Sequence, residues 1–123
     1  MTQRKARRKP GREIVAEWDP DERNWLEAFQ TAIRSKHAKA VKDIVIYGSK
    51  ARGDWHKDSD IDVLLILTNE AAGQRETLEN LAYDLSVTAD ALPLLTTLTE
   101  KEWDRESGTG FQRAIERDGV SVL

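Results

Sequence analysis

The stretch from Tyr47 to Leu67, YGSKARGDWHKDSDIDVLLIL, decides how this chain of 123 residues folds. It predicts a strand that ends at Tyr47, a turn at Gly48–Ser49, a charged loop, and a second strand that opens at Ile61. Beyond Asp62 the second strand is apolar on both faces. We therefore expect it to be buried on both sides and central in its sheet.

Two carboxylates stand at the opening of that second strand. Asp60 and Asp62 are two residues apart, so both side chains point to the same face of the sheet. Neighbouring carboxylates repel each other unless a cation lies between them. Mg²⁺ suits this position, because it takes one or two carboxylates together with substrate phosphates. The pair predicts a magnesium site for one or two ions, and the alternative is a pair of solvated strand-end carboxylates.

The Gly48–Ser49 turn predicts the phosphate-binding half of the same site. Glycine lets backbone amides approach a phosphate closely, and a short helix starting at Ser49 would direct its N-terminus at the anion. The Ser49 hydroxyl can donate to a phosphate oxygen, and Lys50 and Arg52 can balance the charge of a triphosphate. Alone, a Gly-Ser pair is simply a turn. Together with the two carboxylates it favours a site for a nucleoside triphosphate and magnesium.

The flanking segments predict helices packed on a small sheet. Asp19 begins a helix that runs to about Ala40, with Glu22 completing a capping-box-like pattern. A second amphipathic helix is expected from Glu70 to about Ser86. The remaining expected elements are a strand over 42–47, a strand within 87–98 with Pro93 at an edge or bulge, a short helix capped by Thr99 that carries Trp103, and a last helix ending at Asp118–Gly119. The fold class is α/β, of the α+β type, with a small mixed sheet and flanking helices.

Composition limits the possible functions. The sequence has no cysteine, which excludes disulfides and thiolate metal sites and fits a cytoplasmic protein. Six of the 19 basic residues lie in residues 1–12, where no acid occurs, so 13 basic residues accompany all 22 acids in the rest. We expect a flexible basic tail over 1–12 and one domain over 13–123 that is not a nucleic-acid binder. The tail is either a solvated terminus or a contact for RNA, DNA or an acidic partner.

The motif Gly48-Ser49, ten residues, Asp60-Ile61-Asp62 resembles the signature of the nucleotidyltransferase superfamily that includes DNA polymerase β. The short chain is similar to the minimal nucleotidyltransferase (MNT) branch, whose members are often encoded beside a HEPN protein as a toxin–antitoxin pair. The resemblance implies a polymerase β-like palm over about residues 20–120. It also implies that Asp60 and Asp62 hold Mg²⁺, while Gly48, Ser49 and Arg52 hold the triphosphate of ATP.

A third carboxylate usually completes the metal site of that superfamily, on a later strand, and helps to activate the incoming hydroxyl. Asp90 is the candidate here for a metal ligand and catalytic residue, with Asp84 as the fallback. The alternative is that Asp90 lies in a loop and caps a turn. The alanines beside Asp90 and the nearby Pro93 depart from the usual apolar strand pattern. If neither aspartate reaches the metal, nucleotide binding without turnover remains.

The resemblance implies a function. We expect this chain to move AMP from ATP onto a hydroxyl, expected to be a tyrosine, of a HEPN-type toxin, and so to act as its antitoxin. The alternatives are an antitoxin that neutralises by contact alone, or a stand-alone enzyme for a small acceptor of the antibiotic type. No residues are left for an acceptor-binding domain, so the acceptor is expected to come from another macromolecule or from a second copy in a homodimer. In the loop, Trp55 is a candidate for adenine stacking or partner contact and His56 for phosphate contact, and the alternative is an exposed loop tip.

Overall fold

The computed structural model describes residues 11–123 of the chain. The predicted flexible tail lies outside the described residues except for Gly11 and Arg12. These two residues belong to helix α2 (Gly11–Ala16), which the sequence did not predict. Ile14 of α2 is buried in the core, so the helix that contains Gly11 and Arg12 packs against the rest of the fold.

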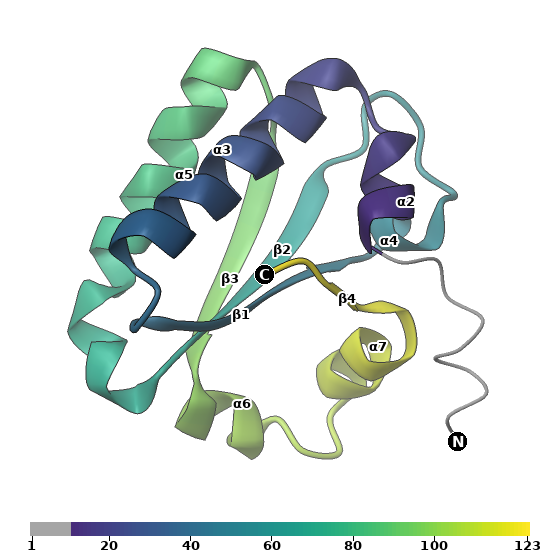
Figure 1. The fold of residues 1–123 in the computed structure, drawn as a ribbon. Coiled ribbons are helices and arrows are strands. Elements are labelled where there is room, and N and C mark those ends of the chain that lie inside the picture. The colour runs from purple at the N-terminus through teal and green to yellow at the C-terminus, as the bar shows by residue number, and fades with distance from the viewer. Residues whose placement is uncertain (1–10) are drawn as a thin grey trace.

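One mixed sheet of four strands forms the centre of the molecule (Figure 1). Its strands are β1 (Val41–Tyr47), β2 (Ile61–Leu67), β3 (Pro93–Thr99) and β4 (Val120–Ser121), in the order β3-β2-β1-β4. Strand β1 is antiparallel to both β2 and β4, whereas β2 and β3 are parallel. The predicted mixed sheet and the central, buried position of the second strand are confirmed.

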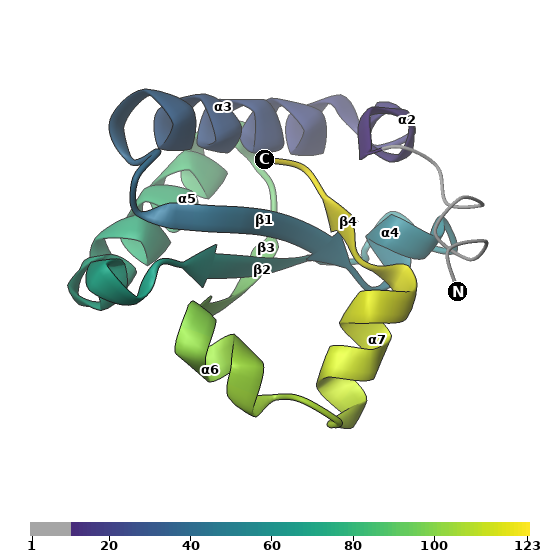
Figure 2. The same cartoon turned by 60° about the horizontal axis from the view of Figure 1, so that its bottom comes forward.

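Helices cover both faces of this sheet. Two longer helices, α3 (Pro20–Lys36) and α5 (Arg75–Ala89), lie on one face, and α6 (Glu100–Arg105) and α7 (Gly110–Asp118) lie on the other (Figure 2). The remaining helical segments are α4 (Ser49–Arg52), directly after β1, and a 3-10 helix (Asn69–Gln74) that leads into α5. Among residues 11–123, no helix has the length and apolar character needed to cross a membrane.

The main core lies between the sheet and the helices α3 and α5. Trp25, Phe29 and Ile33 of α3 are fully buried there and recur every four residues along one face of the helix. The rings of Trp25 and Phe29 stack with centroids 5.3 Å apart. Trp25 Nε1 also donates to the backbone oxygen of Ala82, at 2.9 Å, and so joins α3 to α5.

A smaller apolar cluster fills the opposite face, under α6 and α7. Val45, Leu64, Ile66 and Ile115 form its buried part, with partly buried aromatic side chains around them, including Trp103. Along β2 the side chains alternate between the two clusters, because successive residues of a strand point to opposite faces. This alternation fixes which face receives the two aspartates that open the strand.

The segment before β3 differs from the prediction. Val87 belongs to α5, which continues to Ala89, and the strand begins only at Pro93. The helix ends at Asp90, whose backbone is left-handed with φ 57°. Proline is tolerated as the first residue of an edge strand, and Pro93 occupies that position, so its predicted edge placement is confirmed.

Candidate nucleotide and metal site

The glycine of the turn and the second aspartate of the pair touch each other. Tyr47 pairs with Asp62 in the antiparallel register of β1 and β2, so Gly48 leaves β1 beside that carboxylate. Gly48 has φ 71°, a conformation that favours glycine. A Cβ atom built at position 48 would lie 2.3 Å from Oδ2 of Asp62. Only glycine fits here, and its absence of a side chain joins the phosphate half of the motif to the carboxylate half.

Asp62 lies on the sheet face that carries α6 and α7. Its neighbours at alternate positions, Leu64 and Ile66, belong to the apolar cluster of that face. Asp62 and Asp60 are both partly exposed. Partial burial raises the pKa of the Asp62 carboxyl above its ordinary value, and the charge of Asp60 raises this pKa further. The two carboxylates are therefore close enough to repel each other, as the sequence predicted.

This donor set fits Mg²⁺ held together with a substrate. Two partly exposed carboxylates, Asp62 on β2 and Asp60 directly before the strand, supply hard oxygen ligands, and Mg²⁺ prefers one or two such groups plus phosphate oxygens. A cation between Asp60 and Asp62 would also relieve the repulsion that raises the pKa of Asp62. Within residues 11–123, no group of three acidic, histidine or cysteine side chains is arranged to hold a metal ion.

The prediction of Asp90 as the third carboxylate is corrected by this arrangement. Asp90 is exposed at the end of α5 instead of lying on a strand, and it does not join Asp60 and Asp62 in a three-ligand group. The fallback, Asp84, is exposed on α5 and does not join them either. On β3, the residue in register with Asp62 is Leu94. The alternative reading of Asp90, a residue at a turn, describes its place in the fold.

Arg52 lies near the carboxylates and remains a candidate for phosphate contact. Its charge lowers the pKa of Asp62, against the effects of burial and of Asp60. The side chain is 44% exposed, with Nε 3.2 Å from Asp54 Oδ2 and Nη1 3.6 Å from Asp118 Oδ2. Asp118 was missed as a neighbour of this site, because the sequence marks Asp118–Gly119 only as a helix end.

Lys50 occupies a different place from the one predicted. Its side chain is fully buried, and Nζ lies 2.6 Å from Oε1 of Glu22 in the first turn of α3. The same Nζ lies 3.9 Å from the ring centroid of Trp55 and 5.9 Å from that of Trp18. Such distances are typical of cation–π contacts. The structure therefore places the Lys50 ammonium in the core, paired with Glu22, and not at the predicted phosphate contact.

The contacts of Lys50 also correct two other expectations. Glu22 does not complete a capping pattern with Asp19, which makes no side-chain capping hydrogen bond. The carboxylate of Glu22 pairs with Lys50 instead. Trp55 is partly buried against the core and covers Lys50, so it is neither an exposed loop tip nor a free stacking surface. His56 is exposed, and its backbone N–H donates to Ser59 Oγ at 3.0 Å.

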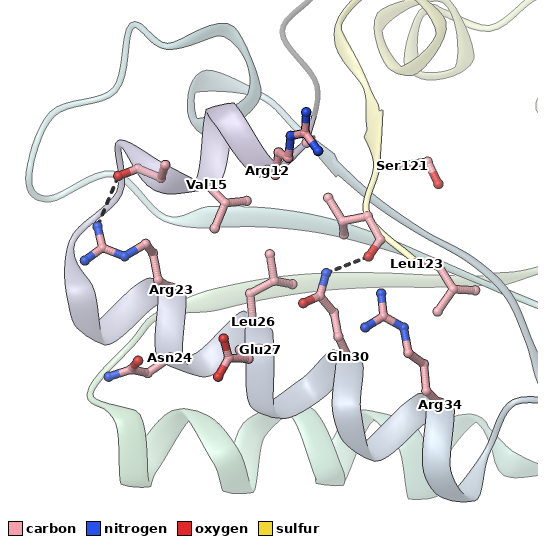
Figure 3. Close-up of a pocket in the computed structure, with 13 residues that line it drawn as sticks. Arg12, Val15, Arg23, Asn24, Leu26, Glu27, Gln30, Arg34, Ser121 and Leu123 are labelled. Carbon is pink, nitrogen blue, oxygen red and sulfur yellow. Dashed lines mark hydrogen bonds between the residues drawn. The ribbon is translucent and has the colours of Figure 1, made fainter.

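A cavity of about 630 Å³ lies elsewhere, between α2, α3 and the end of the chain (Figure 3). None of the residues lining it belongs to the Gly48–Asp62 stretch. Several of its polar groups are already bonded within the protein: Arg23 Nη1 donates to the oxygens of Ala16 and Trp18, and Gln30 Nε2 donates to that of Val122. We therefore place the candidate site at the aspartate pair and not in this cavity.

Comparison with known proteins shows the family of this chain. The family model described as "Nucleotidyltransferase domain" matches residues 26–117, which include both halves of the motif. A segment of 46 residues is 39% identical to the "Putative protein adenylyltransferase MJ0604" of Methanocaldococcus jannaschii. That segment covers 37% of this chain and 46% of the relative, so the match spans less than half of the relative's length.

Two solved structures match this chain over most of its length. The first is a chain from a crystal structure of a toxin–antitoxin with AMP-PNP, with a TM-score of 0.52 and 22% identity. The match covers 79% of this chain and 71% of that one. The second is a putative nucleotidyltransferase from Sulfolobus solfataricus, with a TM-score of 0.45 and 20% identity over 85% of this chain and 87% of that one. The first likeness supports the architecture of sheet and helices described above.

Proposed function

Because this chain belongs to the nucleotidyltransferase domain family, we propose that it moves AMP from ATP onto a hydroxyl of a partner protein. The contact between Gly48 and Asp62 carries the proposal: it holds a turn suited to phosphate against carboxylates suited to Mg²⁺. Protein as the class of acceptor follows from the relative, which is a putative protein adenylyltransferase. ATP as the donor agrees with the AMP-PNP in the structural neighbour.

Each residue of the candidate site has its own role in the proposed reaction. Asp60 and Asp62 would hold Mg²⁺, which when bound neutralises phosphate charge and polarises the phosphate that is attacked. The amides at the start of α4 have no partner within that helix and can donate to the triphosphate, together with the Ser49 hydroxyl. Arg52 would exchange its exposed contacts with Asp54 and Asp118 for a phosphate oxygen.

The transfer itself is a displacement at phosphorus. The acceptor oxygen forms a bond to the α-phosphorus of ATP, and the bond from that phosphorus to the oxygen bridging to the β-phosphate breaks. Pyrophosphate leaves with the electron pair of that bond, and the proton of the hydroxyl passes to water. Asp90 lies at a helix end and does not join the aspartate pair. The chain's own contribution to this step is therefore the positioning and charge that Asp60 and Asp62 provide.

The partner we propose is a HEPN-type toxin, which would be silenced when one of its tyrosines carries AMP. This proposal makes the chain an antitoxin and places it in the cytoplasm with its substrate ATP. It rests on the resemblance of the Gly48–Asp62 motif to minimal nucleotidyltransferases. It also agrees with the fold shared with a chain from a toxin–antitoxin structure.

The test is to incubate the chain with ATP, Mg²⁺ and the HEPN-type protein encoded beside its gene, and to weigh the partner by intact-mass spectrometry. We expect one added AMP, on a tyrosine located by peptide mapping. Asp60→Asn and Asp62→Asn should each abolish the addition. Asp104→Asn, the same change at an exposed position of α6, should leave it unchanged. An unmodified partner in the presence of chain that binds Mg²⁺ and ATP would contradict the proposal.

A second function is favoured by the absence of a third metal-binding carboxylate in residues 11–123. The chain would bind ATP and neutralise its partner by contact, without turnover. This alternative predicts that the double variant Asp60→Ala, Asp62→Ala still protects cells from the toxin. The transfer mechanism predicts that the same variant fails to protect, although it is produced and still binds the partner. Cell survival on co-expression decides between them.

A further inference from the structure

Apolar side chains gather on the surface at one place beside the candidate site. Among residues 11–123, the large hydrophobic residues that are exposed are Tyr83, Val87, Leu92, Leu94 and Leu123. All except Leu123 lie at the end of α5 and the start of β3. Val87 is 83% exposed and Leu92 is 67% exposed. We call Tyr83, Val87, Leu92 and Leu94 the β3-edge patch.

The β3-edge patch adjoins the catalytic face directly. Leu94 is in register with Asp62 on the neighbouring strand, and both side chains point to the same face. The N–H of Ile61, between the two aspartates, donates to the oxygen of Leu92 at 3.0 Å. Neighbouring strands lie about 4.8 Å apart, so Leu94 is the first side chain beyond Asp62 in the direction of the sheet edge.

The other half of the patch borders the free edge of β3. Tyr83 and Val87 are one turn apart on α5 and therefore lie on one face of the helix. The Tyr83 hydroxyl accepts a hydrogen bond from the backbone N–H of Leu95, at 3.4 Å, which places this ring over the outer side of the strand. Strand β3 ends the sheet, and edges of this kind are usually protected by charged side chains. Here the edge is apolar.

We propose that the β3-edge patch is the surface on which the protein acceptor docks, a proposal that rests on the function above. The acceptor hydroxyl must reach ATP held against Asp62, so a protein that carries it must also cover Leu94. Single exposed hydrophobic residues need no explanation, but four of them around one sheet edge beside the candidate site are typical of an interaction surface. The acceptor therefore presents an apolar contact next to the hydroxyl that is modified.

Charge defines the acceptor further. No Lys or Arg occurs between Arg75 and Lys101, a segment that contains the whole β3-edge patch. Acidic residues remain in it, and Asp84 and Asp90 are exposed next to patch residues. Complementary charges steer association and select partners. The acceptor surface should thus be apolar at its centre and basic at its rim, which gives the exposed Asp90 a role in recognition in place of metal binding.

The experiment compares the double variant Val87→Ser, Leu92→Ser with Leu123→Ser, the same kind of change at the exposed hydrophobic residue outside the patch. The probe is the HEPN-type protein encoded beside the gene, titrated calorimetrically and assayed for AMP transfer. We expect the patch variant to bind the probe at least about tenfold more weakly, a difference of about 1.4 kcal/mol. Its rate of AMP transfer should fall in parallel. Leu123→Ser should bind as the unchanged chain does.

Measurement of Mg²⁺-dependent ATP binding and of the melting temperature shows that each variant is folded. A second variant, Asp84→Lys with Asp90→Lys, should weaken binding of the probe and reduce the dependence of that binding on salt. Equal binding and transfer by the patch variant and the unchanged chain would overturn the docking surface and leave the proposed function standing.

Patch-dependent binding of the probe without any AMP transfer would support the docking surface and refute the transfer function. A probe that neither binds nor is modified would overturn the docking proposal. Sedimentation of the isolated chain gives one further outcome: if the patch variant separates a dimer into monomers, a second copy occupies the patch and the proposal is wrong.

Discussion

Nζ of Lys50 lies 2.6 Å from Oε1 of Glu22, and both side chains are buried. This ion pair fastens α4, the short helix that begins at the predicted phosphate-binding serine, to the first turn of α3. Trp18 strengthens the link, because its Nε1 donates to the backbone oxygen of Lys50 at 3.4 Å. The pair therefore sets the position of the turn from within the core.

Breaking this pair should destabilise the protein strongly. Lys50→Met leaves Glu22 buried without its partner, and Glu22→Leu leaves the ammonium in the same state. Removing one member of a buried ion pair costs about 3–5 kcal/mol, whereas replacing both with apolar residues is often neutral. We expect each single variant to lose roughly that amount and the double variant to recover most of it. Urea unfolding monitored by tryptophan fluorescence measures all three.

The double variant also tests whether Lys50 touches the nucleotide. If it does not, the folded double variant should bind Mg²⁺ and ATP about as tightly as the unchanged chain does. A charged hydrogen bond to phosphate contributes about 1.5–3 kcal/mol, so a direct contact would appear as a loss of tenfold or more. Such a loss in a variant of normal stability would contradict the structural role.

Gly48→Ala should separate nucleotide binding from folding. The added methyl group would press on Asp62 Oδ2 and displace the carboxylate. We expect Mg²⁺-dependent ATP binding to weaken at least about tenfold, a loss of about 1.4 kcal/mol. Gly108→Ala is the matched control, since Gly108 also has a positive φ, 81°, but no atom lies within 4 Å of the built Cβ. Calorimetric titration of both variants makes the comparison, and equal affinities would contradict the steric argument.

Asp62 should make stability depend on pH in the direction opposite to that of a typical carboxylate. Burial, and then Asp60, raise the pKa of Asp62 in the folded chain, so the folded state holds this proton more tightly than the unfolded state. Stability from Asp62 is greatest below the unfolded value near 3.8 and is lost as pH rises through the raised pKa. In magnesium-free buffer, Asp62→Asn should therefore melt at a higher temperature than the unchanged chain at pH 7.

The same difference should shrink as the pH falls toward the ordinary range of aspartate, because the protonated Asp62 then resembles asparagine. Thermal unfolding over a series of pH values checks the trend. Mg²⁺ with ATP should reduce or reverse the difference at pH 7, since only the unchanged chain keeps its full set of ligands. An asparagine variant that is less stable than the unchanged chain in magnesium-free buffer at pH 7 would contradict this assignment.

Asp90→Gly distinguishes a helix-end residue from a metal ligand. Asp90 has φ 57°, and a left-handed conformation costs a residue with a side chain roughly 1 kcal/mol more than glycine. We expect the variant to be more stable by about that amount in chemical unfolding. Its Mg²⁺-dependent ATP binding should stay unchanged, in contrast to that of Asp62→Asn. Loss of magnesium-dependent binding in Asp90→Gly would restore Asp90 to the metal site.

The sheet was predictable from the sequence where local rules suffice. An apolar strand, a glycine turn and a second strand opening with Asp60 and Asp62 are encoded within the stretch Tyr47–Leu67, and the structure keeps all of them. The capping box of α6 is also encoded by residues close in sequence. Thr99 Oγ1 accepts a hydrogen bond from the backbone N–H of Glu102, and the Glu102 carboxylate accepts one from the backbone N–H of Thr99. Both signals depend on residues that are near one another in the chain.

The errors have a common physical cause, which is contact between distant residues. In its own segment, Lys50 has the character of a solvent-exposed charge. Its ion-pair partner, Glu22, lies 28 positions earlier, and no neighbouring residue indicates this pairing. Val87 and Thr88 favour strands, which predicts a strand at the end of α5, but both are exposed residues of a helix whose other residues pack on β3 and α3. Asp90 was displaced from the expected strand by the same extension of the helix.

The close contact between Gly48 and Asp62 restricts the order in which mutations can remove the residues of this motif. While the aspartate is in place, any larger residue at position 48 meets its oxygen, so the glycine is protected by its neighbour as much as by the substrate. A descendant that loses the chemistry and keeps only its partner must lose the acid before a larger side chain has room at position 48, where φ 71° still favours glycine. Related chains that keep Gly-Ser but lack the aspartates would then be expected among proteins that were once enzymes. Chains that keep the aspartates but lack the glycine should be rare.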